Sequence, residues 1–170
     1  MPITVDTVLA DPVKIVLAVV LVELITLTLV REHIAGKVVV EWYEKFRLGA
    51  FVSDVASMTF GVFLALCLFK YVFPREWFTL PHFLVCVVAI QVTHDALFSV
   101  LLRHVPVKKN AMMEMLSRYV GENGWKILLV DAVMMMGCVL MLYLLLPVQS
   151  PLIWFGLAFA LYLAQYLIFA

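Results

Sequence analysis

The sequence predicts an all-α fold, a polytopic bundle of transmembrane helices with five spans. Of the 170 residues, 65% are hydrophobic and 14% are charged, and the mean hydropathy is +1.08. A soluble domain is nearer half apolar. The apolar residues also fall into five runs of about the 20 residues that a helix needs to cross a bilayer. We therefore treat residues 1–170 as a single transmembrane domain.

Charged residues and prolines mark the ends of the runs. The first run follows Asp11 and stops at Arg31, the second stops at Lys70, and the fourth stops at Pro147. The predicted spans cover residues 12–30, 47–69, 81–102, 125–146 and 151–170. The first residues include no basic segment and no small-residue cleavage site, so we expect no removable signal peptide.

Lys and Arg concentrate on one side of the predicted bundle. The loops after the first and third spans hold nine of the twelve: Arg31, Lys37, Lys45, Arg47, Arg103, Lys108, Lys109, Arg118 and Lys126. Basic loops stay in the cytoplasm. The N-terminus is then predicted outside, and the C-terminus and both basic loops are predicted inside.

Each basic loop contains a short amphipathic segment. One face carries Val38, Val39, Trp42, Tyr43 and Phe46 in the first loop, and Met112, Met115, Leu116 and Tyr119 in the second. Pairing of Glu41 with Lys45 and of Glu114 with Arg118, four residues apart, would support a helix. We interpret both segments as helices in the membrane interface. Ordinary loop turns are the alternative.

The two loops and the spans around them are similar to each other. The match places His33 on His104, Lys37 on Lys108, Glu41 on Glu114, Lys45-Phe46 on Arg118-Tyr119, Asp54 on Asp131 and Met58 on Met135. The repeat units would be residues 12–69 and 82–146, related by an axis along the membrane normal. Chance similarity between apolar segments is the alternative.

Each of the first four spans carries one acid: Glu23, Asp54, Asp95 and Asp131. At about 1.5 Å per residue, all four lie roughly 8–10 Å below the cytoplasmic end of their spans. An acid that faces lipid costs about 2.5–3.5 kcal/mol on insertion scales. We therefore expect all four to converge inside the bundle.

Other polar residues share faces with these acids. Gln91 and His94 lie beside Asp95, Thr26 follows Glu23, and Ser57 follows Asp54. The layer could be a structural hydrogen-bond network, neutralised in part by the side chains of Arg47, Arg103 and Lys126. It could also be a proton or cation pathway. A metal site is the weakest reading, because the spacing matches no metal-binding motif.

Small residues recur every four positions in two spans. They are Gly49, Ser53, Ser57, Gly61 and Ala65 in the second span, and Gly156, Ala160 and Ala164 in the fifth. Such stripes let helix backbones approach closely. We predict that they pack inside the bundle or between protomers.

The sequence contains no motif for catalysis or for a cofactor. It has no phosphate-binding loop, no nucleophile elbow and no pair of histidines at haem or zinc spacing within a span. Cys67, Cys86 and Cys138 lie in apolar runs and are expected to be buried thiols. The net charge of zero suggests no nucleic-acid partner. We expect no enzyme, no cofactor and no bound metal.

One stretch, residues 91–137, resembles small multi-span membrane proteins of large nucleocytoplasmic DNA viruses. The similar features are His94-Asp95, Pro106, Asn110, Tyr119, Asp131 and Met134-Met135. The resemblance implies a viral or virion-internal membrane as the setting. It transfers no catalytic residue.

These observations lead to two hypotheses of different classes. The first is a structural or assembly protein of a membrane, whose partners are the lipid bilayer and further copies of itself or neighbouring membrane or capsid proteins. The alternative is a small proton or cation carrier that uses the four intramembrane acids.

Overall fold

The computed structural model describes residues 3–32, 34, 36–104 and 110–169. Helices make up almost all of this part, with short connections between them, which confirms the all-α fold class. His33 and Lys108 of the predicted repeat lie outside the described residues. So do Lys109 of the second basic loop and Pro106 of the viral resemblance.

Five helices are long and apolar enough to cross a membrane, as predicted. They are α2 (Val13–Arg31), α4 (Leu48–Tyr71), α5 (Leu80–His104), α7 (Lys126–Leu145) and α8 (Ser150–Phe169). Every boundary lies within two residues of the predicted one. Pro12, Pro81 and Pro151 stand at helix starts, where a missing N–H costs nothing because that position has no intrahelical acceptor.

Both amphipathic segments are helices rather than loop turns: α3 (Lys37–Phe46) and α6 (Ala111–Asn123). The side chain of Asn110 caps α6 by accepting hydrogen bonds from the N–H groups of Met112 and Met113. Each short helix is followed by a residue with positive φ, Arg47 at 47° and Gly124 at 52°. This conformation turns the chain from the short helix into the next long one, and it is costly for a residue with a Cβ such as Arg47.

Two short elements were not predicted. Helix α1 (Val5–Leu9) begins with a capping box between Thr4 and Thr7, and η1 (Arg75–Trp77) is a 3₁₀ turn between α4 and α5. Asp6 of α1 forms an ion pair with Lys70 at the end of α4, with 3.2 Å between Oδ1 and Nζ. Helix α1 thereby covers one end of the bundle.

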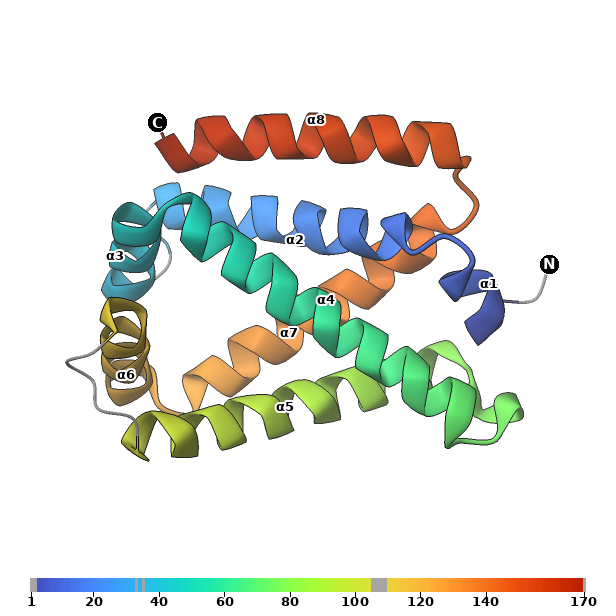
Figure 1. Ribbon diagram of the computed structural model, residues 1–170, viewed down its shortest axis with the longest axis horizontal. Helices are drawn as coiled ribbons and strands as arrows, with labels where there is room; N and C mark the ends of the chain where they lie inside the picture. Colours follow the sequence, from blue (N-terminus) through green and yellow to red (C-terminus); the bar gives the residue numbers. More distant parts are fainter. Residues whose placement is uncertain (1–2, 33, 35, 105–109, 170) are drawn as a thin grey trace.

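Helix α2 is the centre of the bundle (Figure 1). It packs against α4, α7 and α8. Helix α5 also packs against α4 and α7, but on the side of these two helices that faces away from α2. Helices α4 and α7 cross in the middle of the view. The short helices α3 and α6 contact each other at the end of the bundle where the C-terminus lies.

The helices pair as two equivalent units would. The contact of α2 with α4 has its counterpart in that of α5 with α7, and α2 with α7 corresponds to α5 with α4. The positive-φ residues Arg47 and Gly124 also occupy equivalent places, between the short helix and the crossing helix of each unit. This arrangement supports the internal repeat of residues 12–69 and 82–146, which stays a prediction.

The small residues of the two stripes have different environments. In α8, Ala160 and Ala164 are buried, and a Cβ added at Gly156 would lie 3.3 Å from Leu17 of α2. In α4, Gly61 and Ala65 are buried, and a Cβ at Gly49 would lie 3.6 Å from the end of Met112. Ser53 and Ser57 are exposed and add nothing to packing within the chain. Of the cysteines, Cys138 is buried but Cys67 is exposed and Cys86 half-buried, so the prediction of three buried thiols is wrong.

Candidate functional site: a buried carboxyl cluster

The four intramembrane acids lie close together. Glu23 of α2 lies near Asp54 of α4 and Asp131 of α7, and Asp131 lies near Asp54 and Asp95 of α5. One acid from each of four long helices therefore meets the others inside the bundle. We call Glu23, Asp54, Asp95 and Asp131 the carboxyl cluster.

Tyr43 of α3 connects two members of the cluster. Its hydroxyl group lies 2.6 Å from Oδ2 of Asp54 and is also hydrogen bonded to Oε1 of Glu23. Trp42 donates from Nε1 to the same Asp54 oxygen at 3.2 Å. A phenol has one proton, so it can donate to one carboxyl group and must accept from the other. Both Tyr43 contacts are hydrogen bonds when one of the two carboxyl groups carries a proton.

Asp95 anchors the other half of the cluster. Its Oδ1 accepts from Nε2 of Gln91 at 2.8 Å and lies 3.0 Å from Nδ1 of His94. Asp131 lies near Asp95 as well. Two ionised carboxylates are both acceptors, so these two can bond to each other only when one of them carries a proton.

The hydrogen bonding of the cluster is incomplete. Glu23 is fully buried, and among the described residues its Oε2 and the Oδ2 of Asp95 have no hydrogen-bond partner. None of the ion pairs in the described part of the chain joins a Lys or Arg to a member of the cluster. The arrangement thus concentrates acidic oxygen atoms without a basic side chain to neutralise them.

Several polar residues expected beside the acids lie elsewhere. The hydroxyl of Thr26 bonds to the carbonyl of Val22, and that of Ser57 to the carbonyl of Asp54, so both satisfy their own helix instead. Small hydroxyl side chains in helices commonly bond backwards in this way. Arg47 does not reach down to the acids, because its guanidinium stacks over the ring of Phe169.

Three aromatic residues of the site were missed in the sequence. Trp42 and Tyr43 were assigned to the apolar face of α3, and Tyr119 to that of α6. Burial, followed by the charges of Asp131, Asp54 and Asp95, raises the pKa of the Tyr119 hydroxyl well above its ordinary value. Burial and the carboxyl groups of Glu23 and Asp54 raise the pKa of the Tyr43 hydroxyl even more than that of Tyr119 is raised. Both phenols therefore keep their protons over the whole physiological pH range.

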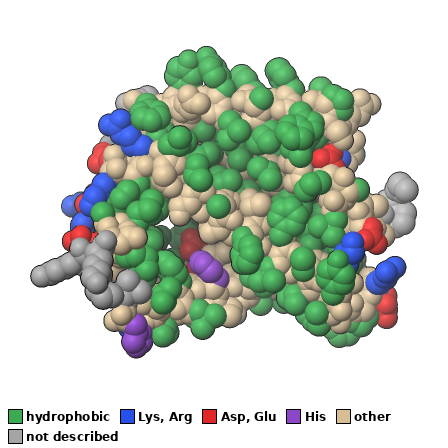
Figure 2. All heavy atoms as spheres, viewed as in Figure 1, with side chains coloured by type: hydrophobic (Ala, Val, Ile, Leu, Met, Phe, Trp, Pro, Cys, Tyr) green, Lys and Arg blue, Asp and Glu red, His purple; other side chains and the backbone are tan. Residues whose placement is uncertain are grey.

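One edge of the cluster is open to the surroundings. The side chain of His94 is 49% exposed, whereas that of its partner Asp95 is 11% exposed. Figure 2 shows acidic atoms at the floor of a hollow, with a histidine side chain at its rim. An imidazole can take up a proton on one ring nitrogen and release one from the other, which makes it a suitable entrance for protons.

An ion pair between Arg118 and Glu41, which we call the clamp, joins the two short helices α3 and α6. Arg118 of α6 donates two hydrogen bonds, each 2.9 Å long, to the two carboxylate oxygens of Glu41 on α3. The predicted partners within each helix, Lys45 for Glu41 and Glu114 for Arg118, form no ion pair. Hydrogen bonding to Arg118 lowers the pKa of Glu41 from its ordinary 4.5.

The clamp should make the contact between α3 and α6 sensitive to acid. Because the folded pKa of Glu41 lies below its unfolded value, the contribution to stability is complete above about pH 4.5 and disappears as the pH falls through the folded pKa. Arg118→Leu should lower the unfolding temperature at neutral pH and remove this part of the acid dependence. Thermal unfolding across the pH range measures both. Glu114→Gln, on the same helix, is the control and should unfold at the same temperature as the wild type. If it lowered the unfolding temperature as much as Arg118→Leu does, the clamp would not be the cause.

The cluster does not have the arrangement of a metal site. Among the described residues, no group of three or more His, Cys, Asp or Glu side chains is placed to hold a metal ion. Two of the acids, Glu23 and Asp54, are instead connected through the hydroxyl group of Tyr43.

No family model, no curated protein and no solved structure matches this chain. The resemblance of residues 91–137 to viral membrane proteins stays a prediction.

Proposed function

We propose that this protein is a small proton carrier, which takes up and releases protons at the carboxyl cluster. The observation that carries the proposal is the meeting of four carboxyl groups, one fully buried and three partly buried, without an ion-paired Lys or Arg among the described residues. Charged carboxylates at this spacing repel one another and lose their hydration. Binding of protons is the simplest way to remove both costs.

The incomplete hydrogen bonding favours a carrier over a purely structural network. Buried polar groups that serve packing normally have partners, because each buried group left without one costs about 1–3 kcal/mol. Two carboxyl oxygens of the cluster lack such partners in the described part of the chain. Groups that bind and release a proton must change partners, so they are not all satisfied in one state.

A route for protons is available on the edge of the cluster. The half-exposed His94 contacts Asp95, and Asp131 lies near both Asp95 and Asp54. Tyr43 then bridges Asp54 and Glu23. A proton that enters at His94 could pass from group to group into the centre of the bundle, as in other chains of intramembrane ionisable residues.

The orientation belongs to the same proposal. We place α3, α6 and the C-terminus in the cytoplasm, because nine of the twelve basic residues lie in or beside the loops that contain α3 and α6. The N-terminus is then outside. The cluster would lie nearer to the cytoplasmic face, below the two short helices.

A second candidate, a structural or assembly protein, is supported by the position of the cluster. Its four acids and Tyr43 come from five different helices, so their hydrogen bonds would hold the bundle in one arrangement. In this case the exposed apolar faces would meet lipid, further copies of the chain or neighbouring membrane or capsid proteins. The viral setting is part of this candidate.

Proton flux into liposomes separates the two candidates. The full chain is reconstituted with a pH-sensitive dye inside, and a potassium diffusion potential drives proton entry. We expect flux with the wild type, and loss of flux without unfolding in Asp131→Asn, which keeps the side-chain shape but cannot ionise. Glu44→Gln, an exposed acid of α3, is the matched control and should conduct normally. Wild-type liposomes no leakier than empty ones, together with unfolding of Asp131→Asn, would support the structural candidate instead.

A further inference from the structure

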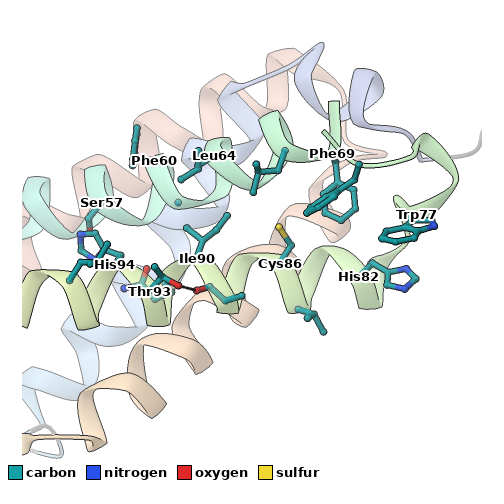
Figure 3. Close-up of a pocket in the computed structure, with 17 residues that line it drawn as sticks. Ser57, Phe60, Leu64, Phe69, Trp77, His82, Cys86, Ile90, Thr93 and His94 are labelled. Atoms are coloured by element: carbon teal, nitrogen blue, oxygen red, sulfur yellow. Dashed lines mark hydrogen bonds between the residues drawn. The ribbon is translucent and has the colours of Figure 1, made fainter. Parts of the chain in front are cut away.

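A groove runs along the lipid-facing side of the bundle between α4 and α5. It has a volume of about 620 Å³. Ser57 and His94 lie at one end and Trp77 at the other, with Phe60 and Phe69 between them (Figure 3). The size is that of a site for a small organic molecule. So is the lining, which is mostly apolar with a few polar groups near its two ends, Ser57, Thr93 and His94 at one and His82 at the other.

The end of the groove at His94 leads to the carboxyl cluster. Gln91 and His94 line the groove, and both contact Oδ1 of Asp95, at 2.8 Å and 3.0 Å. A molecule at this end is thus separated from Asp95 by a single layer of side chains. No Lys or Arg lies among the described residues of the lining.

We propose that this groove binds lipophilic organic cations, which would be the substrates of the proposed carrier. The charge of the cluster selects for a cation and against an anion, because like charges repel strongly in an apolar environment. The inference rests on the proposed function, in which the same carboxyl groups gain and lose protons.

The walls of the groove favour an organic cation over an inorganic ion. Phe60, Phe69, Phe73 and Trp77 line it, and aromatic rings attract cations to their faces. A large organic cation carries a spread charge, so it loses less hydration than a small ion when it leaves water. The groove also opens to the hydrocarbon, where such molecules accumulate; Phe60 is 67% exposed.

Protons should compete with the cation. The titratable groups that face the cluster are Glu23 from α2, Tyr43 from α3, Asp54 from α4, His94 and Asp95 from α5, Tyr119 from α6, and Asp131 and Cys138 from α7. Protonation of the acids removes the negative charge that attracts the ligand. Binding should therefore weaken as the pH falls.

Calorimetry with tetraphenylphosphonium as the probe tests the inference on the full chain in nanodiscs, with empty nanodiscs as the reference. We expect binding about tenfold weaker near pH 5.5 than near pH 8. The neutral triphenylphosphine oxide and the anion tetraphenylborate should bind at least about tenfold more weakly than the cation. Equal binding of the anion would overturn the proposal.

Two variants locate the site. Asp95→Asn should weaken tetraphenylphosphonium binding about tenfold by removing the nearest charge, and Ala89→Trp should abolish binding by filling the groove that Ala89 lines. Ala96→Trp, exposed on the same helix but outside the groove, is the matched control. Unchanged binding in Asp95→Asn or in Ala89→Trp would overturn the proposal. Proton flux without cation binding would refute this inference and leave the carrier standing, whereas the absence of both would refute both.

Discussion

Tyr43→Phe should destabilise the bundle by about 2 kcal/mol, within the range of about 1–3 kcal/mol for a buried polar group that loses its partner. The substitution removes one oxygen atom and leaves the ring. Asp54 keeps the hydrogen bond from Trp42, but Glu23 is fully buried, and among the described residues its other oxygen has no partner. The loss should therefore exceed the roughly 0.6 kcal/mol of an average hydrogen bond inside a membrane protein.

Tyr119→Phe is the matched control for Tyr43→Phe. The Tyr119 hydroxyl lies near the same acids, but it forms no hydrogen bond within the described part of the chain. Its removal should change stability by less than about 0.5 kcal/mol. Unfolding in a mild detergent, followed by the loss of helical signal, measures both variants. Equal stability of Tyr43→Phe and the wild type would show that Glu23 does not depend on this hydroxyl.

Gly61→Leu should have a larger effect than Tyr43→Phe. We expect it to lower the free energy of unfolding by about 3 kcal/mol, at the upper end of the usual cost of overpacking. Gly61 lies where α4 crosses α7, and a Cβ at this position would come within 2.9 Å of the terminal methyl of Met135, which is fully buried. The same Cβ would lie 3.9 Å from Oε1 of Gln91 on α5. A leucine must therefore push α4 away from both neighbours.

The smaller change Gly61→Ala should be nearly neutral. The Met135 methyl is the end of a flexible side chain that can move by a few tenths of an ångström, and alanine gains about 1 kcal/mol of helix propensity over glycine. Ala56→Leu, on the exposed face of α4, should stay within about 0.5 kcal/mol of the wild type. The same unfolding assay compares all three. If Ala56→Leu cost as much as Gly61→Leu, close packing at the crossing would not be the cause.

The long helices could be predicted from the sequence because membrane length sets their size. Apolar runs bounded by charges and prolines gave all five spans within two residues. The short α1 was missed because five residues of mixed polarity carry no periodic signal; its capping pair Thr4 and Thr7 is the one local sign. The turn η1 has no apolar pattern at all.

The acids of the site could also be predicted, since burial of a charge is visible in an apolar run. Their donors could not. Tyr43 and Trp42 look apolar in an amphipathic helix. Their polar atoms reach Asp54 because α3 packs against α4 and α2. One signal was available: buried acids need donors, and these rings carry O–H and N–H groups on the face that turns towards the bundle.

Pairings that cross between helices were the least predictable. Arg118 pairs with Glu41, 77 positions away, rather than with Glu114 on its own helix. Local spacing suggests the second pair and offers no information on the first. The contact depends on how α3 and α6 are brought together by the spans that precede and follow them.

The central place of α2 has a consequence for biosynthesis. Of the five long helices, α2 leaves the ribosome before the other four, and its neighbours α7 and α8 follow α4 and α5. Lys14 bonds to a carbonyl 132 positions later and Arg31 to one 136 positions later. Until α3 and α4 emerge, Glu23 has neither Tyr43 nor Asp54 beside it. The nascent helix must therefore wait at the insertion machinery or enter the lipid with its acid protonated, and a chain cut short before α8 would leave one side of α2 uncovered.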